Sequence, residues 1–140
     1  MRVCGIELSA SEAKLVVLDG SGDELVVVPC STHKIMLQDD EFSKHIRSLY
    51  NDFDDLVKNY AIDRIAIKKR RKKGKFAGGP VSFKIEAIIQ LLSNCDVQLV
   101  DAATISAFAK KNPLSLPSGL HTYQQIAFDV ARTALGQSGI

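Results

Sequence analysis

The hydrophobic pattern of this 140-residue chain changes its period once, near residue 39, and this change limits the possible folds more than any other feature. Before it, apolar and β-branched runs at 2–8, 13–18 and 24–30 are separated by short polar or glycine-containing turns. Such runs predict three antiparallel strands that follow one another in sequence. The segment 31–38 is then interpreted as a connection.

After residue 39 the apolar residues follow a helical period. Six of them are spaced alternately by four and three positions, which predicts one face of an amphipathic helix: Phe42, Ile46, Leu49, Phe53, Leu56 and Tyr60. Three acidic residues at 39–41 stand at the expected start of this helix, where the helix dipole favours negative charge.

The rest of the chain alternates between strands and helices. The pattern predicts a buried strand at 63–68, a helix opened by Pro80 and Ser82, a strand at 96–101, a short helix at 103–111 and a last helix that ends at Gly136. Thr122 and Gln125 have the spacing of a capping box, so we expect the last helix to begin at Thr122.

The predicted fold class is α/β, with a mixed five-stranded sheet made of three antiparallel strands and then two βα units. Helices cover both faces of this sheet. Right-handed crossovers make the fourth and fifth strands parallel to the first, so the polar ends of strands one and four become neighbours. The length suits a single domain over residues 1–140.

The composition excludes several classes of protein. With 46% apolar and 24% charged residues the chain has the proportions of a soluble globular protein, and no apolar run approaches the roughly 20 residues of a membrane helix. The chain opens in a strand-like stretch rather than a signal peptide, so we expect a cytoplasmic protein without a membrane partner. Three widely spaced cysteines and three scattered histidines lack the spacing of a zinc site.

Positive charge is concentrated directly after the strand predicted at 63–68. Positions 68–75 hold seven of the 18 basic residues and no acid, so 11 basic and 16 acidic residues leave the remainder at −5. Such a segment favours a polyanionic partner. We predict contacts to the phosphate backbone of DNA or RNA and stacking of the aromatic ring on a base, through Lys68, Lys69, Arg70, Arg71, Lys72, Lys73, Lys75 and Phe76. The alternative is a solvated loop without a partner.

Two acidic residues stand among apolar neighbours. Strand alternation places Glu7 on the face opposite to the larger apolar residues of its strand, where the carboxylate needs water, a partner or a metal. Asp129 lies in the last predicted helix, in a polar line with Gln125 and Arg132. A surface ion pair between Asp129 and Arg132 is the simple alternative to a functional role.

The order of elements and two stretches, VCGIELSASEAKLVVLDG (3–20) and FDVARTAL (128–135), resemble the ribonuclease H-like superfamily. The resemblance is nearest to its RuvC and YqgF branch of Holliday-junction resolvase-like proteins, and the chain would form a separate family of small bacterial proteins there. The first stretch resembles the opening hairpin, whose first strand carries a catalytic acid, and the second resembles the closing helix with its catalytic Asp. The resemblance implies that Glu7 and Asp129 are catalytic and hold Mg²⁺ or Mn²⁺ for phosphodiester hydrolysis. It also implies a homodimer.

The chain departs from the pattern of these relatives at two positions. The fourth strand usually ends in a Glu, where residues 67–69 are Ile-Lys-Lys here, and Ile126 stands where the closing helix usually carries another acid or His. A lysine in that place could pair with Glu7 and would repel a divalent cation. Glu86, early in the second predicted helix, is the candidate for a replacement catalytic acid. Its alternative is a solvated helix acid.

Three functions follow from these observations. The leading hypothesis is a nucleic-acid-binding protein of ribonuclease H-like fold, with hydrolysis unproven. The alternative is a divalent-metal-dependent nuclease or resolvase-like hydrolase. A lesser alternative is a nucleotide- or phosphate-binding module of the sugar-kinase and actin kind, although the turn after Glu7 lacks the glycine of that branch.

Overall fold

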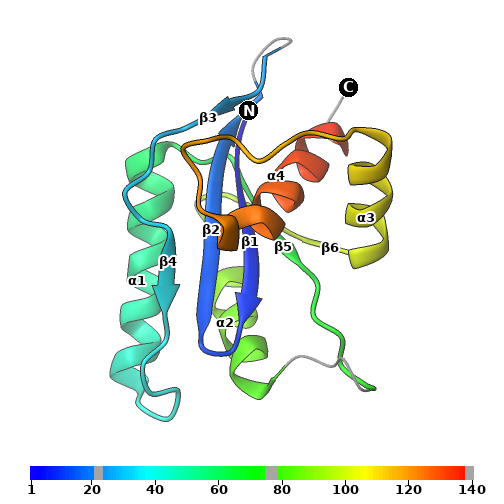
Figure 1. Ribbon diagram of the computed structural model, residues 1–140. Coiled ribbons are helices and arrows are strands. Elements are labelled where there is room, and N and C mark those ends of the chain that lie inside the picture. Colours follow the sequence, from blue (N-terminus) through cyan, green and yellow to red (C-terminus); the bar gives the residue numbers. More distant parts are fainter. Residues whose placement is uncertain (21–23, 75–78, 138–140) are drawn as a thin grey trace.

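The computed structural model describes residues 1–20, 24–74 and 79–137. One mixed sheet forms its centre (Figure 1), with strands in the order β3-β2-β1-β5-β6 and β4 paired with β2. β1 pairs antiparallel with β2 and parallel with β5, and β5 pairs parallel with β6. The strands are β1 (Arg2–Ser9), β2 (Glu12–Asp19), β3 (Val26–Val27), β4 (Lys34–Met36), β5 (Arg64–Lys68) and β6 (Asp96–Val100).

The third predicted strand and the predicted connection need correction. The strand expected at 24–30 is only Val26–Val27, and the connection expected at 31–38 contains β4, so the sheet has six strands rather than five in the described part of the chain. Both pieces pair with β2. Pro29 lies between them, and because proline has no backbone N–H it interrupts a strand ladder.

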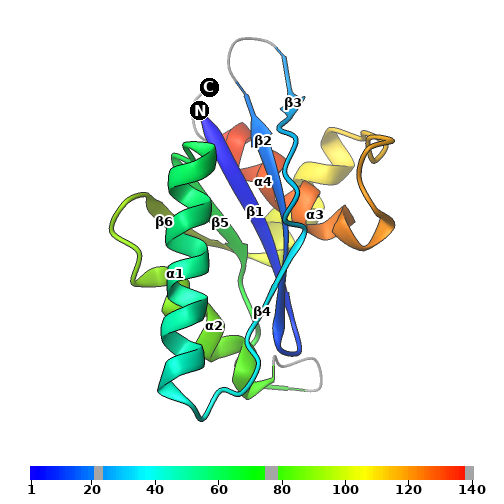
Figure 2. The same ribbon diagram turned by 90° about the vertical axis from the view of Figure 1, so that its left-hand side faces the viewer.

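Helices cover both faces of the sheet, as predicted (Figures 1 and 2). The helical elements are α1 (Ser43–Tyr60), α2 (Pro80–Gln90), α3 (Ala102–Lys111), the 3₁₀ turn η1 (Thr122–Gln124) and α4 (Gln125–Gln137). Residues of α1 and α2 share one hydrophobic core with one face of the sheet, and residues of α3 and α4 share a second core with the other face. No helix among the described residues is long and apolar enough to cross a membrane.

The alternation of β1 fixes which residues face which layer. Cys4, Ile6 and Leu8 lie in the core beneath α1 and α2, and Val3 lies in the core beneath α4. Gly5 also faces α4: a Cβ atom there would lie 2.2 Å from the Ala127 carbonyl oxygen. Glycine is therefore required for α4 to approach the sheet at this level.

Two helix starts differ from prediction. The last helical segment is capped by His121, whose backbone N–H donates to Oε1 of Gln124 at 2.8 Å, so the capping box stands one residue earlier than the predicted Thr122–Gln125 pair. A short 3₁₀ turn precedes α4 and absorbs the shift. The acidic residues 39–41 precede α1, which has no acid in its first turn. Asp39 acts in the preceding turn instead, where its Oδ1 accepts from the Glu41 backbone N–H, and Asp40 pairs with Lys84 of α2 at 2.8 Å.

Candidate nucleic-acid interface

A row of charged residues crosses the α4-facing side of the sheet where β1 and β5 end. Lys34 is opposite Lys14, and Lys14 is opposite Glu7. The register of β1 and β5 ends at Ile6 and Ile67, so Glu7 and Lys68 occupy the next position on their strands. Side chains alternate along a strand, and Glu7 is two residues after Gly5, which faces α4. Lys68, Glu7, Lys14 and Lys34 therefore all lie on the α4-facing side of the sheet. The predicted adjacency of the ends of these two strands is therefore present.

Glu7 is paired with a lysine of the neighbouring strand. Its Oε1 atom lies 4.0 Å from Nζ of Lys14, and the Lys14 and Glu7 side chains are only 20% and 16% exposed. The sequence predicts a lysine at the end of β5 as the partner. The hairpin supplies Lys14 instead, because the two-residue turn at Ala10–Ser11 sets Glu7 opposite Lys14.

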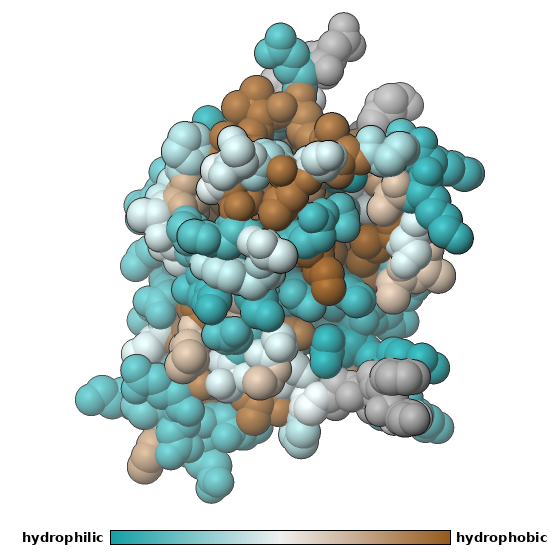
Figure 3. Space-filling model, in the orientation of Figure 1, coloured by the Kyte–Doolittle hydropathy of each residue, from teal (hydrophilic) through white to brown (hydrophobic). Residues whose placement is uncertain are grey.

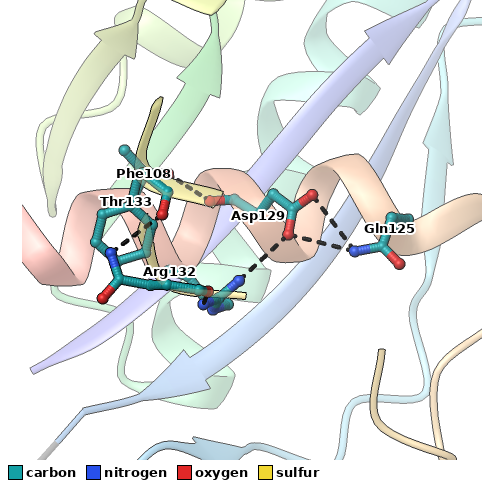
Figure 4. Close-up of polar contacts among 6 residues, drawn as sticks. Phe108, Gln125, Asp129, Arg132 and Thr133 are labelled. Atoms are coloured by element: carbon teal, nitrogen blue, oxygen red, sulfur yellow. Dashed lines mark hydrogen bonds and ion pairs between the residues drawn. The ribbon is translucent and has the colours of Figure 1, made fainter. Parts of the chain in front are cut away.

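Asp129 belongs to a different cluster, on α4 (Figure 4). Its two carboxylate oxygens accept from Nε2 of Gln125, each at 3.3 Å, and Oδ1 lies 3.6 Å from Nη1 of Arg132. Ala127 and Ala131, which contact Gly5, are each two residues away, or about 200° around the helix. Asp129 therefore lies on the side of α4 turned away from the sheet and Glu7.

Arg132 fixes this cluster against the rest of the protein. It is 7% exposed, donates through Nη2 to the Asn112 carbonyl, and stacks between the rings of Phe108 and Phe128, with its Cζ atom 5.4 and 5.5 Å from the two centroids. A guanidinium held on aromatic faces and paired with a carboxylate is a stable arrangement in a protein interior. The polar line of Gln125, Asp129 and Arg132 is present as predicted, with a clear structural role.

Glu86 is buried rather than solvated, so the expectation of a solvated helix acid is wrong. Its residue is 9% exposed, and burial raises the pKa of its carboxyl group. A hydrogen bond from the Arg70 backbone and the charges of Lys72, Lys69 and Arg70 act in the opposite direction on that pKa. Its Oε2 atom is buried without a hydrogen-bond partner in the part of the chain that the structure describes. α2 lies on the opposite side of the sheet from α4, so Glu86 and Glu7 come from different layers.

These residues do not fit the two-metal carboxylate site that the resemblance implies. Glu7, Asp129 and Glu86 lie in three separate clusters, and each has a basic residue as its neighbour. Across residues 1–20, 24–74 and 79–137, no group of three or more His, Cys, Asp or Glu side chains could hold a metal ion. A neighbouring ammonium or guanidinium lowers the affinity of a carboxylate for a dication. The arrangement favours stabilised ion pairs over a Mg²⁺ or Mn²⁺ centre.

The start of the basic segment is attached to the end of the sheet. The Lys69 backbone N–H donates to the Val100 carbonyl at 2.9 Å, and Nζ of Lys69 lies 3.8 Å from Oδ1 of Asp101. The next residue is held by the contact of its backbone with Glu86. Arg71, Lys72 and Lys73 follow and are exposed. The first part of the run is therefore anchored, and its charges project from a fixed position.

A hollow of about 460 Å³ lies beside this segment. Residues 69–73 line it, together with Asp101 and Ala102 at the amino-terminal end of α3. Backbone N–H groups at the start of a helix and a surrounding set of cations both favour an anion. The remaining predicted contacts, Lys75 and Phe76, lie outside the described residues.

One cluster was not anticipated from the sequence. The His121 ring stacks on the Tyr123 ring, and the His33 ring contacts His121 at a tilt of 58°, with both pairs of centroids 5.1 Å apart. Nζ of Lys34 lies 4.2 Å from the Tyr123 centroid. Lys34 is the outer member of the charged row across the sheet. The residues are almost 90 positions apart in sequence, so only the tyrosine and histidine preceding the last helix could have suggested aromatic chemistry here.

The fold is similar to solved structures of Holliday-junction resolvases. RuvC of Thermus thermophilus matches with a TM-score of 0.64 at 9% identity, over 95% of this chain and 92% of that one. The same organism's RuvC in complex with Holliday junction substrate matches with a TM-score of 0.61 at 10% identity, over 95% of this chain and 91% of that one. The fowlpox virus Holliday junction resolvase matches with a TM-score of 0.53 at 16% identity, over 97% of this chain and 98% of that one. At these identities the likeness shows a shared ribonuclease H-like fold.

The sequence itself gives a narrower match. No curated protein sequence matches the chain. A family model described as "Protein of unknown function (DUF3010)" matches residues 1–134, which is nearly the whole length. The chain therefore belongs to the DUF3010 family.

Proposed function

We propose that this protein binds nucleic acid without hydrolysing it, through the basic segment that follows β5. The observation that carries the proposal is the anchoring of this segment by Val100, Asp101 and Glu86, which leaves Arg71, Lys72 and Lys73 exposed beside a hollow. Anchored cations lose less conformational entropy on binding a phosphate than those of a free loop. Phosphate contacts of this kind give affinity but no sequence preference.

The charged row extends the proposed surface across the sheet. From Lys68 on β5 it passes Glu7 and Lys14 to Lys34 on β4, a span of about 14 Å at the usual strand spacing. At its far end Lys34 rests on the Tyr123 ring, which is 36% exposed. An aromatic face next to cations suits an unpaired base, because stacking needs no particular base. We infer a preference for single-stranded or locally unpaired substrates.

The lack of hydrolysis follows from the pairing of the candidate acids. Glu7, Asp129 and Glu86 remain the residues to test as catalytic groups, with Mg²⁺ or Mn²⁺ as the cofactor of the alternative function, a resolvase-like nuclease. The likeness of the fold to resolvases is the observation that favours this alternative. We also propose that the chain is nearest to the RuvC and YqgF branch of the ribonuclease H-like superfamily. Residues 1–140 would form a single domain, and the protein would act in the cytoplasm as a homodimer.

A binding and cleavage assay separates the two functions. Purified protein is incubated with labelled single-stranded, duplex and four-way-junction DNA and with matching RNA, with and without Mn²⁺. We expect a retarded band without product. A triple variant, Arg71→Gln, Lys72→Gln and Lys73→Gln, should lose the retarded band.

The matched control removes the same charge elsewhere, through Lys44→Gln, Arg47→Gln and Lys111→Gln, all exposed in the structure. This control should bind as the wild-type protein does. Cleavage that disappears in Asp129→Asn would overturn the non-catalytic function in favour of the nuclease. Equal binding by the two triple variants would overturn the proposed surface.

A further inference from the structure

β4 is an edge strand whose outer side is unpaired in the described part of the chain. It pairs with β2 through Ile35, and the neighbouring bonds from Leu15 N–H to the His33 carbonyl and from Leu37 N–H to the Ser11 carbonyl continue the same ladder. In an antiparallel ladder the residues between such pairs direct their backbone groups outward. The N–H and C=O groups of Lys34 and Met36 therefore point away from β2, and Met36 is 57% exposed.

A groove runs along this free edge, with α1 as its other wall. One hollow of about 430 Å³ lies between β4 and α1, and a second of about 120 Å³ continues it, because Met36 and Asp52 line both. Figures 1 and 2 both show α1 and β4 side by side over the length of the strand. The α1 wall presents Asp52, Asp55 and Asn59, which lie on one side of the helix at three- and four-residue spacing.

The groove carries the charges of Asp52 and Asp55, of which Asp55 interacts with Lys58 only at longer range. Among the described residues neither Asp52 nor Asp55 forms an ion pair, whereas Asp54 on the next face of the helix pairs with Lys58 at 2.7 Å. Lys34 of β4 is among the residues that line the larger hollow, but its Nζ atom lies 4.2 Å from the centroid of the Tyr123 ring. Edge strands are often protected by a lysine, but here the ammonium group of that lysine is placed against an aromatic ring.

We propose that this groove binds an extended, basic segment of a partner protein, which adds a strand to β4. The bound segment would exchange backbone hydrogen bonds with Lys34 and Met36 and place basic side chains over Asp52 and Asp55. Positions three apart on a helix rise by about 4.5 Å, and alternate residues of a strand lie about 6.7 Å apart. Two basic residues at alternate positions of the segment therefore reach the two carboxylates with their flexible side chains.

The charge of the groove favours a basic protein segment over nucleic acid, a second copy of this chain or an apolar segment. Nucleic acid would be repelled by Asp52 and Asp55, so the groove is distinct from the basic segment after β5, although Lys34 belongs both to its lining and to the charged row across the sheet. A second copy that paired β4 with β4 would bring like carboxylates together. An apolar segment would leave both carboxylates without a counter-charge.

Fluorescence anisotropy with a defined peptide tests the proposal. The probe is a fluorescein-labelled nine-residue peptide of alternating Lys and Thr, and the control peptide has Glu at every Lys position. We expect saturable binding of the Lys peptide and none of the Glu peptide. The Asp52→Asn, Asp55→Asn double variant should bind the Lys peptide about 3- to 30-fold more weakly. A control double variant, Glu24→Gln with Glu41→Gln, makes the same charge change outside the groove and should bind as the wild type does.

A second variant tests the strand addition itself. Met36→Pro removes an outward N–H that the ladder with β2 does not use, so the fold should tolerate it and binding should weaken about 2- to 10-fold. Amide shifts in an HSQC titration should be confined to β4 and α1. Unchanged affinity in both variants, or shifts centred on residues 68–74, would overturn the proposal. Dimerisation that depends on Met36, measured by sedimentation, would show a second copy as the occupant and would also overturn it.

Discussion

Raising the salt concentration tests the proposed nucleic-acid surface quantitatively. Each phosphate that a basic side chain neutralises releases condensed counterions, so the logarithm of the binding constant falls linearly with the logarithm of the salt concentration. For single strands the slope is about −0.7 for each phosphate contact. The number of cations that the structure presents therefore sets the expected slope.

The described part of the basic segment gives a range for that number. Arg71, Lys72 and Lys73 are exposed and form no ion pair within the described residues, so they give a lower limit of three contacts and a slope of about −2. Including residues 68–70 gives six contacts and a slope of about −4. A change from about 50 mM to about 200 mM salt should then weaken binding by about 20-fold to about 300-fold.

The assay is fluorescence anisotropy of a labelled single-stranded oligonucleotide at a series of salt concentrations. The triple variant of Arg71, Lys72 and Lys73 to Gln should lose about two units of slope, because three contacts are removed. The triple variant of Lys44, Arg47 and Lys111 should keep the wild-type slope. A wild-type slope near zero, or an equal loss of slope in both variants, would refute the reasoning.

Three further outcomes follow from the described contacts. Gly5→Ala should lower the free energy of unfolding by at least about 1–3 kcal/mol in a denaturant titration, because the new Cβ would meet the backbone of Ala127 and Ala131, which cannot move freely. Tyr123→Ala should weaken single-strand binding about 5- to 150-fold but leave duplex binding almost unchanged, as stacking on one base contributes about 1–3 kcal/mol. Glu86→Gln should raise stability relative to wild type increasingly as the pH rises above the ordinary carboxyl pKa, because burial raises the pKa of Glu86 in the folded protein. The folded protein binds the Glu86 proton more tightly than the unfolded chain does. The resulting contribution to the free energy of unfolding is present below the pKa of the unfolded chain and is lost as the pH rises through the pKa of the folded protein. Gln does not titrate, so the variant does not lose this contribution.

Most of the fold could be predicted because its elements carry strong local patterns. The alternation of Cys4, Ile6 and Leu8 and the helical spacing of Leu49, Phe53 and Leu56 each correspond to a buried face. β4 was missed because it has three residues, of which only Ile35 is buried. Such a strand exists through its pairing with β2 rather than through its own sequence, so no local pattern could reveal it.

The candidate site was predicted less well, because its contacts depend on geometry between elements. Glu7 and Asp129 were joined by a family resemblance, but the rotation of α4 about its axis separates them, and this rotation is set by the contact of Ala127 and Ala131 with Gly5. The pairing of Glu7 with Lys14 could be predicted only with the register of the β1–β2 hairpin, which places the two residues opposite each other. The burial of Glu86 beneath the basic segment needs the path of the chain after β5, which no periodicity encodes.

The charge balance at the end of the sheet argues for binding rather than catalysis. Around the ends of β1 and β5 the described chain gathers Lys14, the six basic residues 68–73, and three acids, Glu7, Glu86 and Asp101, so positive charge exceeds negative by four. A two-metal site needs the opposite excess, because carboxylates must offset the charge of two dications. Restoring a single acid, as in Lys68→Glu, would leave Lys14 beside Glu7 and the rest of the segment in place. The net field would still attract phosphate and repel metal ions, so the proposal of binding without hydrolysis does not rest on one missing ligand.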